Sequence, residues 1–192
     1  MRSGLTVLLG ALLLAAVAFG QGPANSGWEV LPSWGQLPAG TTMGAASQVA
    51  TTADGKILVF RRAVPSFVLF NPDGTFVKQW GDQYRLAHGV RVDREGNIWV
   101  TDNTDNFVQK FSADGKLLFT VGRKGMTGDN ASQDAFDGPA DVFVASNGDF
   151  FVADGYRNSR VVQFSKEGKF IKIIGGVKGS EPGQFNLPHS VV

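Results

Sequence analysis

The sequence lacks cysteine altogether, and it has no marked excess of charge of either sign. Without cysteine the chain cannot build a disulfide scaffold, a thiolate nucleophile, a cysteine-ligated zinc site or an iron–sulfur cluster. Its 18 Lys and Arg residues are balanced by 17 Asp and Glu residues, which argues against nucleic acid as a partner. A sustained helical period is also missing after residue 20, so the sequence excludes a helical domain.

The first twenty residues have the pattern of a secretory signal peptide. Arg2 gives a positive start, and Leu5 to Phe19 is an apolar run followed by small residues. The alternatives are a buried helix or a membrane anchor, but this run is short for a span of about 20 residues. We expect residues 1–20 to be cleaved off and the protein to be secreted or periplasmic, without membrane contact after cleavage. We expect residues 21–44 to form an irregular leading segment.

Glycine preceded by a polar turn residue recurs along the rest of the chain. The pairs are Asp54-Gly55, Asp73-Gly74, Glu95-Gly96, Asp114-Gly115, Asn147-Gly148 and Glu167-Gly168. Short β-rich runs, such as residues 57–60 and 161–164, separate them. Asp-Gly and Asn-Gly between apolar runs are strong hairpin signals, and the type I′ turn that they favour needs two residues at positive φ. The sequence therefore predicts an all-β fold.

Residues 86–122 are repeated in residues 138–175, with Asp102 matching Asp154. An earlier copy spans residues 49–81, and another begins at residues 187–192. A period of roughly fifty residues with four short strands is typical of a β-propeller blade, whereas unrelated hairpins would not repeat this order. We expect residues 45–192 to form a partial propeller of about three and a half blades.

Propellers close with four to eight blades, and an open ring leaves an unpaired edge. We therefore expect either the N-terminal part of a longer protein or two copies that complete one ring, and we favour the first. The sequence stops one or two residues into an expected inner strand.

Only two histidines occur, His88 and His189, and both precede an innermost strand, in LAHGV and LPHSV. Innermost strands line the central channel, so both imidazoles are expected to face it. A third histidine further along a complete ring would give the three-ligand geometry of a catalytic zinc site. The alternative is that each histidine caps a turn or binds a neighbouring loop.

The repeats resemble NHL repeats. The string DGYRNSRVVQFSKEGKF with PGQFNLPHSVV is similar to peptidyl-α-hydroxyglycine α-amidating lyase. This resemblance implies a six-bladed propeller with zinc and structural calcium as cofactors. It also implies a peptide or N-acyl α-hydroxyglycine substrate, cleaved to an amide and glyoxylate. Arg157 stands where the family usually has cysteine, and the family's third zinc histidine would lie past residue 192, so we expect the isolated 192-residue chain to be inactive.

The resemblance assigns roles to six residues. The zinc ligands are His88 and His189, the catalytic tyrosine is Tyr156, the active-site arginine is Arg62, and the calcium-binding backbone carbonyls are those of Val49 and Val90.

Zinc bound to the substrate hydroxyl would lower its pKa, and the Tyr156 phenol could act as the base. Arg62 could stabilise the phenolate or pair with the substrate carboxylate. The structural alternatives are a loop aromatic for Tyr156 and a solvated strand end for Arg62, which adjacent Arg61 would share.

Two further sets of residues are expected to support the scaffold. Asp102 and Asp154 recur at strand ends, where a short carboxylate accepts backbone N–H groups. We expect the aromatic residues Trp99, Phe111, Phe151 and Phe164 to pack between blades.

A second functional hypothesis is a non-catalytic propeller that binds a protein or glycan partner, since fold alone does not determine function. A calcium-dependent sugar lactonase is disfavoured, because the axial polar residues here are histidines.

Overall fold

The computed structural model describes residues 27, 29–82 and 84–192, so the expected signal peptide lies outside the described residues. Residues 33–192 form one compact unit. All of its regular structure is β, and the described residues contain no helix that could cross a membrane. The described part of the leading segment, residues 29–44, forms only turns, bends and irregular backbone.

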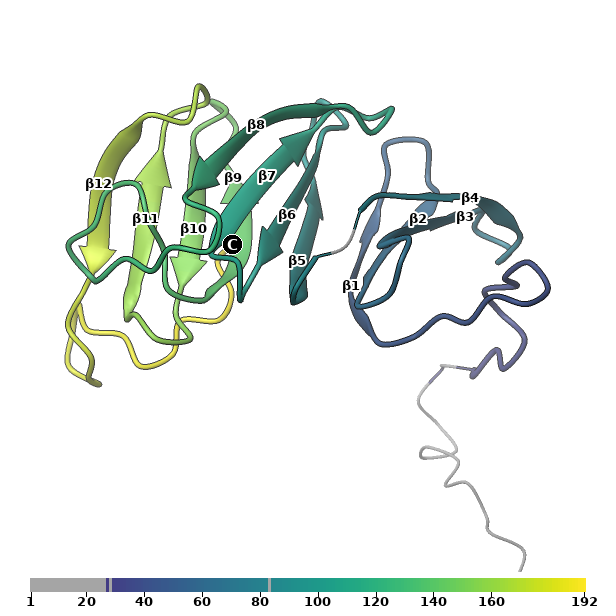
Figure 1. Cartoon of the computed structure of the whole chain (residues 1–192), viewed down its shortest axis with the longest axis horizontal. Coiled ribbons are helices and arrows are strands. Elements are labelled where there is room, and N and C mark those ends of the chain that lie inside the picture. Colours follow the sequence, from purple (N-terminus) through teal and green to yellow (C-terminus); the bar gives the residue numbers. More distant parts are fainter. Residues whose placement is uncertain (1–26, 28, 83) are drawn as a thin grey trace, which may run out of the picture. The chain divides into compact units, whose positions relative to one another are not determined.

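Twelve strands form three antiparallel four-stranded sheets, which confirms the prediction of propeller blades (Figure 1). The first sheet comprises β1 (Ala46–Thr51), β2 (Ile57–Arg61), β3 (Phe67–Phe70) and β4 (Phe76–Trp80). The second comprises β5 (Ala87–Val92), β6 (Ile98–Asp102), β7 (Phe107–Phe111) and β8 (Leu117–Gly122). The third comprises β9 (Pro139–Val144), β10 (Phe150–Asp154), β11 (Arg160–Phe164) and β12 (Phe170–Gly175).

The strands follow chain order within each sheet, and the first strands of the three sheets are neighbours in space: β5 contacts both β1 and β9. Residues 187–192 do not form the inner strand that the sequence predicted, because they have no β-partner among the described residues. The segment that carries His189 is therefore irregular.

The predicted turns are present, but their type differs from the prediction. All six turn glycines have φ between 79° and 96°, while the residue before each glycine does not have positive φ. The glycine N–H donates to the carbonyl three residues earlier, for example from Gly55 to Thr52 at 2.9 Å. One glycine in the left-handed region is sufficient for this turn, so the type I′ requirement for two such residues does not apply.

Two apolar cores fill the spaces between adjacent sheets. Trp99, Phe150 and Phe164 belong to the core between the second and third sheets, and Phe111 packs against the core between the first and second. Phe151 faces away from these cores, and no described sheet covers its side, so its packing between blades stays a prediction. Successive strand residues face opposite sides, so Phe150 enters the core while Phe151 contacts Phe143 on the other face of the third sheet.

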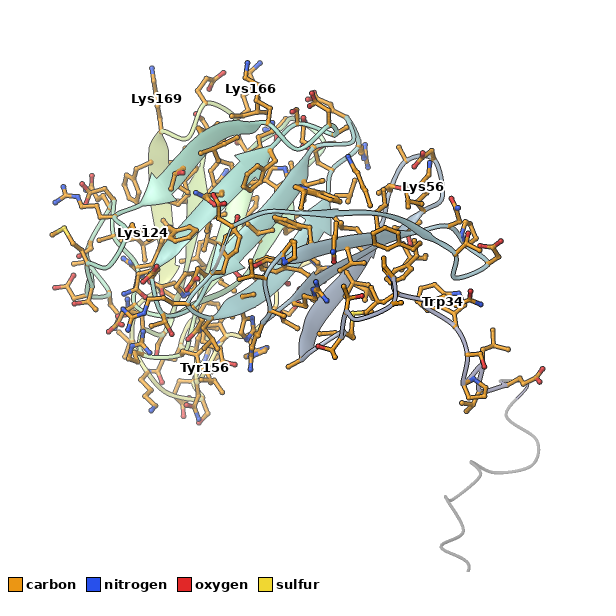
Figure 2. The ribbon with its side chains drawn as sticks, turned by 45° about the vertical axis from the view of Figure 1, so that its right-hand side comes forward. Trp34, Lys56, Lys124, Tyr156, Lys166 and Lys169 are labelled. Carbon is orange, nitrogen blue, oxygen red and sulfur yellow. The ribbon has the colours of Figure 1, made fainter. Side chains whose placement is uncertain are left out.

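Residues 34–43 cover the remaining face of the first sheet. Trp34 packs against Phe70, with ring centroids 5.4 Å apart, and its indole N–H donates to the Pro72 carbonyl at 3.0 Å (Figure 2). Leu37 and Met43 pack beside it. These contacts stabilise the first sheet by removing apolar side chains from water.

Candidate functional site

The site begins where the inner strands β5 and β9 approach each other closely at Gly89. A Cβ atom there would lie 2.7 Å from the Ala140 carbonyl oxygen, so only glycine fits. The Thr101 hydroxyl bridges the two strands: it accepts from the Gly89 N–H at 2.7 Å and donates to the Ala140 carbonyl at 3.0 Å. This contact places His88 against the third sheet.

The same carbonyl sets the tautomer of His88. His88 Nδ1 lies 2.7 Å from the Ala140 oxygen. Because a carbonyl oxygen can only accept, Nδ1 carries the proton and Nε2 presents its lone pair. Metal-ligating histidines are commonly held in this way, with one ring nitrogen donating to a backbone carbonyl.

The Tyr156 hydroxyl lies between the two histidines, 2.9 Å from His88 Nε2 and 2.8 Å from His189 Nε2. The two imidazole centroids are 4.9 Å apart. A hydroxyl has one proton, so Tyr156 donates it to His88 Nε2 and accepts from His189 Nε2–H. The structure therefore brings together the two predicted zinc ligands and the predicted catalytic tyrosine.

The loop that carries Tyr156 leaves β10 through Gly155. A Cβ atom on Gly155 would lie 1.9 Å from the Pro188 carbonyl oxygen, so glycine lets the segment before His189 pass close to this loop. Tyr156 is 40% exposed, enough for its hydroxyl to meet a ligand. It lies at the opposite end of the third sheet from Lys166 and Lys169 (Figure 2).

Arg62 lies beside His88, but Arg61 has a different environment. The Arg62 guanidinium donates through Nε to the Ala87 carbonyl at 3.2 Å. Burial, together with the nearby charges of His189 and Arg62, holds the pKa of His88 below its ordinary value of 6.5, which favours the neutral imidazole that binds metals. Arg61 was expected as a possible solvated strand end; it is instead buried and donates to the Pro65 carbonyl at 2.8 Å.

A buried carboxylate, Asp141, completes the surroundings of His189. It accepts two hydrogen bonds from Arg91, at 3.0 and 2.6 Å, and one from the Ser190 hydroxyl at 2.7 Å. Burial raises the pKa of Asp141, but these bonds outweigh it and hold the pKa below its ordinary value. Asp141 and Ser190, together with Gln48 and both histidines, line a hollow of about 140 Å³.

The side chains fit zinc in their chemistry. Two imidazoles and a phenol offer the nitrogen and oxygen donors that zinc accepts, and a catalytic zinc site keeps a position for substrate. The described residues contain no cluster of three or more His, Cys, Asp or Glu side chains suited to a metal. The two histidines are therefore the protein ligands that the described residues would supply, with Tyr156 beside them.

The predicted calcium-binding residues lie on two inner strands. Val49 pairs with Val59 and Val90 pairs with Val100. Counting from the hydrogen-bonded pairs Thr52–Lys56 and Asp93–Asn97 places both valines at positions that do not bond their sheet partner. Their carbonyls therefore point to the free edges of β1 and β5, and the Val90 N–H on the same edge donates to Gln48 at 2.9 Å.

Asp102 and Asp154 have the structural role predicted for them. The Asp102 carboxylate accepts from the backbone N–H groups of Thr104 and Asp105, at 2.9 and 2.8 Å, and Asp154 accepts from that of Asp137 at 2.9 Å. The sequence analysis missed Thr101, Gln48 and Asp141. An alignment of the strings LAHGV, GPADV and LPHSV could have indicated Asp141, because this residue directly follows the position that is histidine in the other two repeats.

Comparison with known families identifies the repeats. The NHL repeat model matches residues 84–111 and 136–164. A streptogramin B lyase (TM-score 0.53, 17% identity, 70% of this chain and 41% of that one) has the same fold. So does virginiamycin B lyase from Staphylococcus aureus (TM-score 0.55, 15% identity, 78% and 46%). The chain therefore contains NHL repeats, and its sheets are propeller blades.

Among NHL-repeat proteins, its relatives include the amidating lyases. It is 32% identical over 175 residues to the probable peptidyl-alpha-hydroxyglycine alpha-amidating lyase of Caenorhabditis elegans, covering 78% of this chain and 49% of the relative. It is 44% identical over 111 residues to peptidyl-glycine alpha-amidating monooxygenase B of Xenopus laevis (55% and 12%). It is also 30% identical over 176 residues to human NHL repeat-containing protein 3 (86% and 49%). The chain thus spans at most about half the length of these relatives.

Proposed function

We propose that the site belongs to a secreted or periplasmic, zinc-dependent carbon–nitrogen lyase that releases glyoxylate from a peptide or N-acyl α-hydroxyglycine. The observation that carries this proposal is the convergence of His88 Nε2, Tyr156 Oη and His189 Nε2 within hydrogen-bonding distance. The similarity to proteins named as amidating lyases supports the same reaction class.

In this proposal His88 and His189 hold the zinc, which when bound acidifies a coordinated hydroxyl group. Tyr156 acts as the base and accepts the proton of the substrate hydroxyl. The C–N bond then breaks, its electron pair goes to the amide nitrogen, and the hydroxyl oxygen becomes the aldehyde oxygen of glyoxylate. Tyr156 returns the proton to the nitrogen, so the atoms balance and a primary amide is formed.

Arg62 supplies the positive charge for this reaction. Its side chain is exposed next to His88, so it can pair with the substrate carboxylate in bidentate fashion. The carbonyls of Val49 and Val90, on the free edges of β1 and β5, would bind a structural calcium ion, because calcium prefers oxygen ligands.

A second candidate function is non-catalytic binding of a protein or glycan. The observation that favours it is the human relative, which matches 86% of the chain and is named for its repeats alone. A binding propeller does not require zinc, so metal content separates the two functions.

The test measures zinc and glyoxylate separately. Zinc titration of the 192-residue chain should show one site, lost in the H88A/H189A double variant. The protein purified from its native host should release glyoxylate from a peptidyl-α-hydroxyglycine. Zinc that survives in the double variant would refute the assignment of the ligands, and a zinc-loaded native protein that forms no glyoxylate would refute the reaction.

A further inference from the structure

The segment that carries His189 depends on a few side chains for its position. Residues 186–192 lie outside the strands, and their hydrogen bonds among the described residues reach three side chains. These are Tyr156, Arg91 and Asp141. Tyr156 belongs to the proposed reaction, and Arg91 makes one contact, to Ser190 at 3.4 Å, whereas Asp141 makes two, the shorter at 2.7 Å. Asp141 is therefore the main candidate for the anchor of this segment.

Asp141 is itself rigidly held. Its side chain is 3% exposed, and its two oxygens accept from Arg91 and from the Val142 N–H at 2.9 Å. The oxygen Oδ2 also accepts from the Ser190 hydroxyl at 2.7 Å and the Val191 N–H at 3.4 Å. A carboxylate fixed in this way restricts the two residues that follow His189.

The same contact occurs one repeat earlier. Val90 and Val191 are equivalent, because each lies two residues after its histidine in LAHGV and LPHSV. The Val90 N–H donates to Gln48 Oε1 at 2.9 Å, and Gln48 is on the inner strand of the preceding sheet, as Asp141 is for Val191. Each histidine is thus followed by an amide that a polar side chain of the preceding blade accepts.

We propose that Asp141 is a positioning residue for His189, and that Gln48 is the equivalent residue for His88. This inference rests on the proposed function, because it assigns to the two side chains the task of presenting both imidazoles to one metal ion. Asp141 has the larger effect, since His189 lies on an irregular segment while β5 is also held by its ladder with β6.

The chain offers a direct measurement, because it has only two histidines. Its ¹H–¹⁵N imidazole NMR spectrum contains two spin systems, which H88Q and H189Q assign. In the metal-free chain D141A should shift and broaden the His189 signals and leave those of His88 in place. Q48A should do the reverse, with smaller shifts. D141N keeps an acceptor oxygen for Ser190 and Val191, so it should restore most of the His189 signal.

Zinc titration gives the second readout. D141A should weaken zinc binding by about 10–100-fold, the range found when a group that orients a metal ligand is removed, and D141N should lose less. The inference is overturned if D141A leaves the His189 signals unchanged and the zinc affinity within twofold of wild type, even if the variant unfolds more easily.

If D141A does not fold, S190A decides the question, because it removes the hydroxyl that donates to Asp141 at 2.7 Å, and unchanged His189 signals in S190A would overturn the inference. The proposed function fails separately, if the wild-type chain binds no zinc or the native protein forms no glyoxylate. The NMR comparison still determines the role of Asp141 in that case.

Discussion

The loops that follow β6 and β10 begin at equivalent aspartates but serve different purposes. Asp102 uses its buried carboxylate to accept the N–H groups of Thr104 and Asp105, so the loop after β6 folds back on its own first residue. Asp154 accepts instead from two side chains, that of Asn158 in its loop at 2.8 Å and that of Arg160, the first residue of β11, at 2.9 Å.

The difference continues on the paired strands. Phe107 lies opposite Asp102 and Arg160 lies opposite Asp154, and the second loop is one residue longer. Because side chains satisfy Asp154, the backbone N–H of Tyr156 is free to donate to the Gly138 carbonyl at 3.3 Å. The position two residues after the aspartate thus has a structural role in the second sheet, whereas in the third sheet it presents the side chain of Tyr156 to the site.

The largest expected effect tests the chemical side of this comparison. Tyr156→Phe should lower glyoxylate release by the native protein by about 10²–10⁴-fold, because it removes the group proposed to transfer the proton. Zinc content and unfolding midpoint should stay close to wild type. Thr104→Ala changes the equivalent position of the second sheet and should leave the activity unchanged. Equal losses in both variants would show that the two loops do not differ in function.

The next effect concerns the buried ion pair that distinguishes the third sheet. Asp154 and Arg160 side chains are both 0% exposed, with 2.9 Å between charged atoms. Arg160→Met leaves the carboxylate without its cation and should lower the free energy of unfolding by about 3–5 kcal/mol in urea denaturation. Arg157→Met removes a partly exposed ion pair with Asp137 from the same loop and should cost about 0–1 kcal/mol. Similar losses of stability in the two variants would contradict the expectation that the buried ion pair contributes more than the partly exposed one.

Much of this architecture is predictable from the sequence, because its signals are local. Turn glycines and the fifty-residue repeat depend on backbone sterics and on hydrophobic alternation, which act over a few residues. Placing His88 and His189 in one register also predicts that both lie at inner strands. His88 does lie on the inner strand β5, whereas His189 lies on an irregular segment, and the two side chains still meet at Tyr156.

Other features depend on contacts between distant residues and could not be predicted in this way. Arg61 is buried because Pro65 and the leading segment accept its hydrogen bonds, which its place at a strand end does not reveal. Phe151 has the same register as Trp99, but Trp99 is covered by the third sheet and Phe151 by no described sheet. Whether such a side chain is buried depends on whether a neighbouring blade covers it.

A smaller effect is expected from the aspartate of the second sheet. Asp102→Ala leaves buried backbone N–H groups without acceptors and should destabilise the chain by about 1–3 kcal/mol. It breaks no ion pair within hydrogen-bonding distance, so its cost should stay below that of Arg160→Met. Urea denaturation of both variants under one condition provides the comparison. If Asp102→Ala lost more stability than Arg160→Met, the buried ion pair of the third sheet would not be the larger of the two contributions.

The smallest effect is a pH dependence that comes from the turn after β5. The turn after β5 contains Asp93, where the turn after β9 contains Ala145. Burial raises the pKa of Asp93, but hydrogen bonds from Trp99 and Asn97 and the charge of Lys110 outweigh it and hold the pKa below its ordinary value of 3.8.

Because the carboxyl pKa is lower in the folded chain, the unfolded chain binds more protons as the pH falls. The contribution to stability is therefore present above the pKa of the unfolded chain, and it is lost as the pH falls through the pKa of the folded chain. The free energy of unfolding should therefore fall below pH 4 less steeply in Asp93→Asn than in wild type. Urea titrations of wild type and Asp93→Asn at several pH values measure the two slopes, and parallel curves would show that Asp93 makes no such contribution.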